Sequence, residues 1–156
     1  MYANTTSALM QKTGQRLYTI GEAADLIGVS VPTIRMYERE GLIIPLRKAS
    51  RHRLFAEADL RRIQHLRKFI NADKVSIADL RKTMAEIPCW KIMNCAEDKR
   101  VLCRSEADAA FPCWISSHKT WQCKSDECRE CRVYLESEEI CAMKSSSPLL
   151  AEEPAR

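Results

Sequence analysis

Apolar residues recur three or four positions apart along much of the first half of the chain, which is the spacing that places side chains on one face of a helix. Thr19 and Glu22 have the spacing of a capping box at the start of a short helix that Gly28 ends. Ser30 is suited to cap a second helix, and Gly41 to follow its C-terminus in the left-handed conformation. The pattern therefore predicts two short helices joined by a glycine turn.

The next segment carries two short apolar runs, at residues 42–45 and 54–55, on either side of a basic loop at residues 47–53. Apolar runs that flank a polar loop predict a small β-hairpin, or wing. Two further helices are expected after it, the second beginning at Ser76 and ending at Pro88. Their apolar positions at helical spacing are Leu60, Ile63, Leu66 and Ile70, and then Ile77, Leu80, Met84 and Ile87.

Composition sets the boundaries of the parts. Residues 1–16 are polar and small, and residues 143–156 are rich in Ser, Pro and Glu, so we expect both ends to be disordered. Residues 17–87 make up the predicted helical domain. Residues 88–142 hold all eight cysteines, which indicates a separate module whose fold depends on sulfur chemistry.

The net charge of +4 is unevenly distributed along the chain. Residues 1–88 carry 15 Lys and Arg against 9 Asp and Glu, whereas residues 89–156 carry 10 against 12. The basic half is where a phosphate backbone is expected to dock. A long apolar run and the features of a signal peptide are both missing, so we expect a cytoplasmic protein without a membrane span. Without a catalytic constellation, no enzymatic activity is expected.

A DNA-reading pair of helices needs a small residue where the helices touch, a glycine in the turn and an apolar residue on the second helix. Ala24, Gly28 and Ile34 stand at spacings that meet these needs, and Tyr37 follows one turn later on the same face. The surrounding stretches YTIGEAADLIGVSVPTIRMYEREGLI, RHRLF and AEADLRRIQHLRKF closely resemble the DNA-binding domain of the MerR family of transcriptional regulators. The resemblance covers roughly residues 17–87.

This resemblance implies a mainly α fold, a winged helix-turn-helix followed by two more helices. It also implies a homodimer on a palindromic promoter operator, in double-stranded DNA that the protein distorts so that RNA polymerase engages. In the family pattern Glu38 matches the acidic residue that braces the recognition helix, and Phe55 the aromatic that closes the wing. Met36 departs from the pattern, which has an aromatic residue there. The DNA-binding positions that the resemblance assigns are Thr33, Arg35, Tyr37, Arg47, Lys48, Arg51 and Arg53.

The second module is defined by its cysteines, all of which are candidate metal ligands because thiolates in a reducing compartment favour metal binding over disulfides. They are Cys89, Cys95, Cys103, Cys113, Cys123, Cys128, Cys131 and Cys141. The stretch Ile87-Pro88-Cys89-Trp90 recurs as Phe111-Pro112-Cys113-Trp114 and resembles the two-CW cysteine module of bacterial sensory proteins. His118 is expected to be a surface residue.

Three chemistries remain open for this module. An iron–sulfur cluster fits the spacing Cys123-x4-Cys128-x2-Cys131, which plant-type ferredoxins complete with one further cysteine; here Cys141, Cys113 or Cys89 is available. Zinc fits because eight thiolates suffice for two four-thiolate sites, and a short module poor in aliphatic residues needs a staple. Thiol–disulfide switching without metal is the third.

These features predict a DNA-binding regulator that responds to redox or metal status through its C-terminal cysteines. The alternative is a DNA-binding protein whose cysteine module is a permanent structural zinc domain for interaction or dimerisation, without any sensing role.

Overall fold

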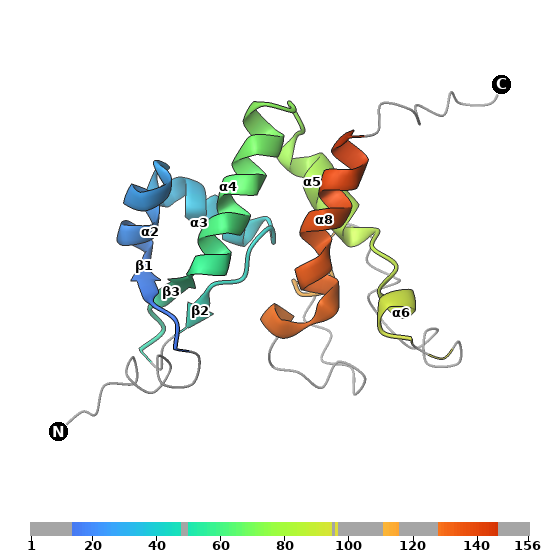
Figure 1. Ribbon diagram of the computed structural model, residues 1–156, viewed down its shortest axis with the longest axis horizontal. Helices are drawn as coiled ribbons and strands as arrows, with labels where there is room; N and C mark the ends of the chain where they lie inside the picture. The colour runs from blue at the N-terminus through green and yellow to red at the C-terminus, as the bar shows by residue number, and fades with distance from the viewer. Residues whose placement is uncertain (1–13, 48–49, 95, 97–110, 116–127, 147–156) are drawn as a thin grey trace. The chain divides into compact units, whose positions relative to one another are not determined.

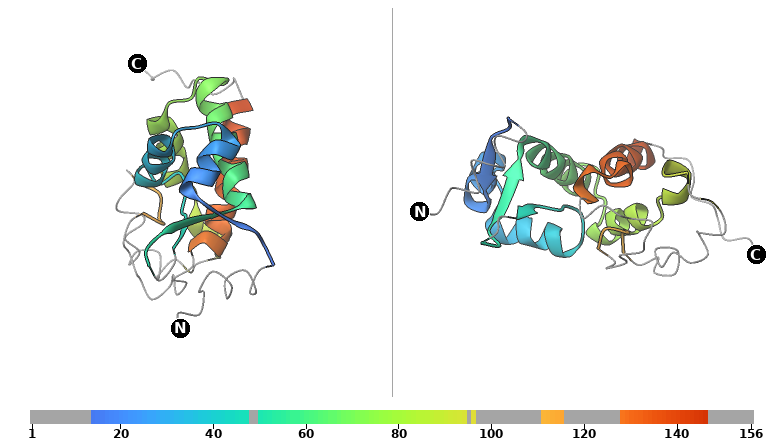
Figure 2. Two further views of the ribbon diagram at one scale, coloured as in Figure 1. Left: turned by 90° about the vertical axis from the view of Figure 1, so that its left-hand side faces the viewer. Right: turned by 90° about the horizontal axis from the view of Figure 1, so that it is seen from below.

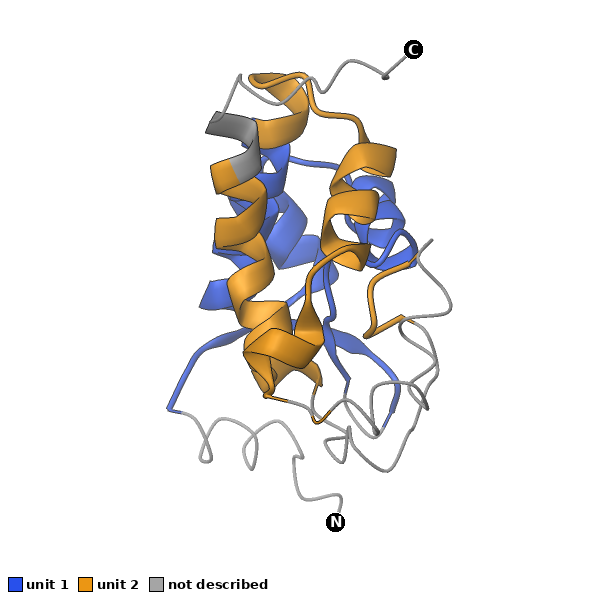
Figure 3. Cartoon of the chain, turned by 90° about the vertical axis from the view of Figure 1, so that its right-hand side faces the viewer, with its two compact units in different colours: residues 1–68 blue, residues 69–156 orange. Residues whose placement is uncertain are grey.

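The computed structural model describes residues 14–47, 50–94, 96, 111–115 and 128–146 of the chain (Figure 1). The chain divides into two compact units, residues 1–68 and residues 69–156 (Figure 3). Helix α4, Glu57–Asn71, begins in the first unit and ends in the second. In the described part of the chain, no helix combines the length and the apolar character needed to cross a membrane.

The first unit contains a helix pair and a three-stranded antiparallel sheet in the order β1-β3-β2 (Figure 2). Its elements before α4 are β1 Leu17–Thr19, α2 Ile20–Ile27, α3 Val31–Arg39, β2 Leu46–Arg47 and β3 Arg53–Ala56. Tyr18 pairs with Phe55 across β1 and β3, and Arg47 pairs with Arg53 across β2 and β3. The strands β2 and β3 form the predicted wing.

The caps of α2 and α3 confirm the sequence prediction. The hydroxyl of Thr19 accepts a hydrogen bond from the backbone N–H of Glu22 at 3.3 Å, and the Glu22 carboxylate accepts one from the N–H of Thr19 at 2.7 Å. That second bond lowers the pKa of Glu22. Ser30 caps α3, and Gly41 follows the helix at φ 74°.

Gly28 and Gly21 offer a matched pair of tests for the backbone of the helix pair. Gly28 has a left-handed φ of 74°, whereas Gly21 lies within α2. A Cβ added at either position would have no other atom within 4 Å, so neither substitution causes a steric clash. We expect Gly28→Ala to lower the free energy of unfolding by about 1–2 kcal/mol through left-handed strain. Gly21→Ala is expected to raise it by about 0.5–1 kcal/mol because alanine favours helix. Chemical denaturation checks both, and equal effects would contradict this account.

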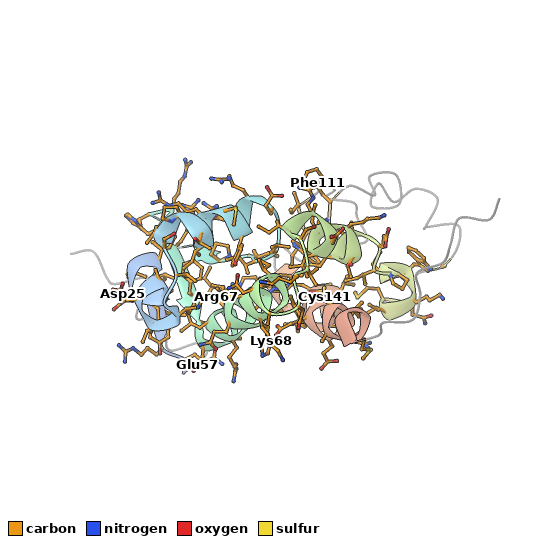
Figure 4. All side chains as sticks on the ribbon, turned by 90° about the horizontal axis from the view of Figure 1, so that it is seen from above. Asp25, Glu57, Arg67, Lys68, Phe111 and Cys141 are labelled. Carbon is orange, nitrogen blue, oxygen red and sulfur yellow. The ribbon has the colours of Figure 1, made fainter. Side chains whose placement is uncertain are left out.

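The core of the first unit joins the helix pair to the sheet and to α4. Two arginines of α4 donate hydrogen bonds to backbone carbonyls near the C-terminal ends of α2 and α3. Arg67, labelled in Figure 4, donates from Nη1 to the carbonyl of Ile27 at 2.8 Å, and Arg62 donates from Nε to the carbonyl of Leu42 at 2.7 Å. The buried apolar residues are Ala23, Ala24, Ile27, Ile34, Tyr37, Leu42, Ile43, Leu54, Phe55, Ala56, Leu60, Ile63 and Leu66. In the last turns of α4, which belong to the second unit, Ile70 is only partly buried, against the sequence prediction, whereas Phe69 is buried.

The second unit is built around helix α8. Its elements after α4 are α5 Ile77–Ala85, α6 Cys89–Ile92, the 3-10 helix η2 Cys128–Glu130 and α8 Arg132–Ser146. Helix α8 contacts α5, α6 and η2. The buried residues of these helices and of the segment just after α5 are Leu80, Met84, Ile87, Val133, Tyr134, Ser137 and Cys141.

Four expectations from the sequence need correction. The first wing strand is β2 at 46–47 and not 42–45, because Leu42 and Ile43 are buried in the core. Ile77 is only partly buried, since it opens the first turn of α5. Helix α5 ends three residues before Pro88, and that proline instead starts α6. Disorder from residue 143 is wrong for residues 143–146, which continue α8; residues 1–13 and 147–156 lie outside the described residues.

Candidate nucleic-acid interface and thiol site

Helix α3 separates an inward face from an outward one. Ile34 and Tyr37 are 0% and 4% exposed, respectively, and anchor the helix in the core. Pro32, Arg35 and Arg39 are exposed at spacings of three and four residues, so they share the outward face. This face carries two guanidinium groups one turn apart. Sequence reasoning missed Arg39, although its spacing of four from Arg35 was the available signal.

Thr33 and Tyr37 hold structural positions in this helix. The backbone N–H of Thr33 donates to the Ser30 hydroxyl at 3.2 Å, and the two hydroxyl oxygens lie 2.8 Å apart. Tyr37 is buried, and this burial raises the pKa of its phenol, so the ring is neutral near pH 7. Tyr37 therefore supports α3 from within the domain, whereas Thr33 is partly exposed and takes part in the cap of the helix. Met36, which replaces the family's aromatic residue, is partly buried.

Glu38 joins α3 to both strands of the wing. Its carboxylate accepts hydrogen bonds from Arg47 Nη2 at 2.7 Å and from Arg53 Nε at 2.5 Å. The side chain of Glu38 is only 15% exposed, against 53% for Arg47 and 33% for Arg53. A carboxylate shielded from water that accepts from two guanidinium groups holds them more firmly than a single surface pair would. Glu38 thus fixes the wing relative to α3.

The tip of the wing places Arg51 at the surface. Arg51 and His52 are exposed, and Arg51 adopts φ 62°, a left-handed conformation unusual for a residue with a Cβ. Lys48, the remaining predicted contact, lies outside the described residues.

A further arginine flanks the sheet at its β1 edge. The guanidinium of Arg16 lies 5.0 Å from the centroid of the Tyr18 ring, and the Tyr18 hydroxyl donates to Glu57 Oε2 at 3.5 Å. Arg16 is exposed. Sequence reasoning missed this contact, because residues 1–16 were expected to be disordered, whereas the structure describes residues 14–16.

Five of the eight candidate ligand cysteines are described, all in the second unit. Cys89, Cys113, Cys128 and Cys131 are partly exposed, and Cys141 is buried. Among the described residues, no three His, Cys, Asp or Glu side chains are grouped so that they hold a metal ion. Cys95, Cys103, Cys123 and His118 lie outside the described residues.

Comparison with known proteins identifies a family match that begins in the first unit and extends into the second. Residues 18–87 match the family model described as MerR HTH family regulatory protein. The HTH-type transcriptional regulator MlrA of Escherichia coli is 43% identical over 56 residues, which are 35% of this chain and 23% of that protein. A probable heavy metal-dependent transcriptional regulator of Haemophilus influenzae is 47% identical over 49 residues, 31% of this chain and 38% of that protein.

The chain thus aligns with well under half the length of these relatives. One solved structure is also similar: the crystal structure of HiNmlR, a MerR family regulator lacking the sensor domain, bound to promoter DNA. The alignment includes 83% of this chain and 73% of the HiNmlR chain, with 21% sequence identity and a TM-score of 0.33. The family model spans the helix pair, the wing and the two helices that follow. The chain therefore carries a MerR-family helix-turn-helix domain at residues 18–87.

Proposed function

We propose that this chain is a MerR-type DNA-binding transcriptional regulator that binds a palindromic promoter operator as a homodimer and responds to redox or metal status through its C-terminal cysteines. The observation that carries the DNA-binding part is the outward face of α3, with Arg35 and Arg39 exposed, beside a wing that Glu38 holds in place. This face lies within the domain that matches the MerR helix-turn-helix family.

The chemistry of these side chains fits a duplex. A guanidinium fork donates two hydrogen bonds to the major-groove edge of guanine, so Arg35 is assigned to base reading. Arg51 at the wing tip suits the phosphate backbone, because phosphate contacts fix register without reading sequence. Arg47 and Arg53 are partly neutralised by Glu38 and are assigned mainly to holding the wing. Thr33 and Tyr37 support the reading face, and Lys48 is assigned to phosphate.

A homodimer is proposed because a single recognition helix reads too few base pairs to select one operator. One α3 covers a few base pairs, and two copies related by a twofold axis read the two halves of a palindrome. Bending or twisting the DNA between the half-sites costs energy that depends on its sequence, and changes how the promoter is presented to RNA polymerase. The polymerase is therefore an indirect partner.

The input is assigned to the second unit, where the described cysteines lie. The Haemophilus relative is named as heavy metal-dependent, which supports a metal as the occupant here. Thiolates bind such soft centres in preference to hard ions. A gain or loss of the centre changes the charge and ligation of these thiols, and we expect the unit to rearrange in response.

Selection of duplexes from a random pool with the full chain tests the DNA-binding part. We expect enrichment of one inverted repeat, and two chains bound per duplex by light scattering. Affinity should fall steeply with salt, since phosphate contacts release counterions. Enrichment of no sequence, or one chain per selected duplex, would contradict the proposal.

A further inference from the structure

Helix α8 carries apolar residues on both of its faces. On its inward face Val133, Tyr134 and Cys141 are 2%, 4% and 1% exposed and belong to the core of the second unit. Leu135 and Met143, on the same helix, are 56% and 67% exposed. A helix that packs on one side only normally carries polar side chains on the other. The outward face of α8 is therefore unusually apolar for a surface in contact with water.

The outward residues of α8 follow the heptad spacing of a helix seam. Arg132, Leu135 and Glu139 are exposed and Ala142 is partly buried, at steps of three, four and three residues. This spacing keeps side chains on one stripe that a second helix can follow. Figure 1 shows α8 beside α5, which it contacts along with α6 and η2. The stripe places one large apolar side chain between a positive and a negative one.

The guanidinium of Arg132 is positioned at the start of this stripe. Its Nε and Nη2 donate to Glu136 Oε1 at 3.1 and 2.9 Å, and its Nη1 donates to the carbonyl of Ile92 at 3.5 Å. The Arg132 side chain is still 68% exposed. A guanidinium has five N–H donors, and the contacts that the structure describes use three of them. Arg132 can therefore accommodate a second carboxylate.

The charges on the stripe are self-complementary when two copies of α8 run antiparallel. Arg132 precedes Leu135 by three residues and Glu139 follows it by four, which is about 4.5 Å and about 6 Å along the helix axis. With Leu135 at a twofold axis, Arg132 of each copy comes level with Glu139 of the other to within about 1.5 Å. A parallel pair would place like charges side by side at both positions. The antiparallel pair is therefore favoured.

We propose that this stripe, with Met143 at its edge, is the surface through which two copies of the chain associate, α8 packing antiparallel on α8 of the partner subunit. The inference rests on the proposed function, because it assigns a surface to the homodimer that a palindromic operator requires. Leu135 packs on its own copy across the twofold axis, and an ion pair with Glu139 flanks it on each side. Met143 lies about 12 Å from Leu135 along the axis and so reaches η2 of the partner subunit.

The exposed leucine of the first unit lacks this pattern. Leu26 is 60% exposed on α2, where its exposed neighbours Glu22 and Asp25 are both acidic. Two copies that met through Leu26 would bring carboxylates together, and like charges that face each other oppose association. Leu26 therefore supplies the matched control for Leu135: the same side chain at nearly the same exposure, without a self-complementary stripe.

Sedimentation of the full chain over a concentration series, reduced and without DNA, tests the surface. We expect the wild type to form a concentration-dependent dimer. Leu135→Asp is expected to raise its Kd by about a hundredfold, since a buried leucine contributes roughly tenfold and the twofold axis counts it twice. Leu26→Asp should keep the Kd of the wild type. Circular dichroism checks the fold, and Leu135→Ser replaces an unfolded Leu135→Asp and must also weaken the dimer.

Charge reversal tests the antiparallel register independently. Arg132→Glu and Glu139→Arg each place like charges opposite one another in their own homodimers, so each alone should dimerise several-fold more weakly. In an equal mixture opposite charges face each other again, and we expect a heterodimer close to wild-type strength by native mass spectrometry. The Arg132–Glu136 pair is absent from Arg132→Glu both alone and in the mixture, so the gain on mixing reports only contacts between copies.

Four results would overturn the inference: a wild type that stays monomeric up to its solubility limit, a Leu135→Asp dimer as tight as the wild type, an equal loss in Leu26→Asp, or a charge-reversed mixture no more associated than its components. The number of chains per selected operator is measured on the same preparations. One chain per operator contradicts the proposed function. Two chains per operator with an unaffected Leu135→Asp dimer contradict only the α8 surface.

Discussion

Replacing Arg35 by alanine is expected to weaken operator binding by about 1–3 kcal/mol, or roughly 5- to 150-fold, and to relax the preference for one base pair in each half-site. Arg35 is exposed on the outward face of α3, while Ile34 next to it is fully buried, so the backbone that carries the guanidinium is fixed. Fluorescence anisotropy with the selected operator and with duplexes altered at single positions measures both effects.

Arg61→Ala is the matched control for this loss. Arg61 is exposed on α4 and shares its outward face with Lys68, seven residues later, so the same charge is removed from another element. Figure 4 places Lys68 on the side of α4 away from α3. We expect Arg61→Ala to change operator affinity less than twofold. If Arg35→Ala and Arg61→Ala reduced operator affinity equally, Arg35 would contribute only its positive charge and would not read a base.

The second large effect is expected from Glu38→Gln, and its direction is informative. Electrostatics alone predicts tighter DNA binding, because a negative charge is removed beside the wing. The geometry predicts the opposite, since Glu38 loses its charge-assisted bonds to Arg47 and Arg53 and the wing loses its attachment to α3. We expect a fall of roughly tenfold in operator affinity, about the strength of one such bond. Titration at two salt concentrations measures it.

Asp25→Asn removes the same charge without touching the wing. Asp25 is exposed on α2, as Figure 4 shows. We expect this variant to bind the operator as tightly as the wild type or slightly more tightly. If Glu38→Gln also bound more tightly, Glu38 would act only as a repulsive charge, and its bracing role would be wrong.

The helices of the first unit were predictable because local signals specify them. The capping box at Thr19 and the glycine at position 28 each satisfy or redirect backbone groups next to them in sequence. Strand β1 has three residues, too few for an alternating pattern, and forms only because β3 supplies its hydrogen-bond partners. Helix α8 was not predicted from the sequence, and its last residues, 143–146, were assigned to a polar tail.

The candidate sites were less predictable from the sequence than the helices, because their geometry depends on tertiary structure. The sequence predicted Arg35 and the wing arginines as DNA contacts, which stays a prediction. The double pairing of Arg47 and Arg53 with Glu38 appears only once β2, β3 and α3 are assembled. Cysteine spacing left Cys141, Cys113 or Cys89 available as the fourth ligand beside Cys123, Cys128 and Cys131. A continuous helix between residues 132 and 146 separates Cys141 from Cys128 and Cys131, which spacing alone does not reveal.

The central claim is that one chain couples a MerR-type reader to a thiol-held centre. Operator affinity and promoter transcription are measured on one preparation with its centre intact and after removal by a chelator under anaerobic conditions, with Cys128→Ser in parallel. We predict a several-fold change in affinity or transcription for the wild type, and for Cys128→Ser a fixed level equal to that of the wild type without its centre. Identical affinity and transcription with and without the centre would contradict the claim and favour a permanent structural zinc module.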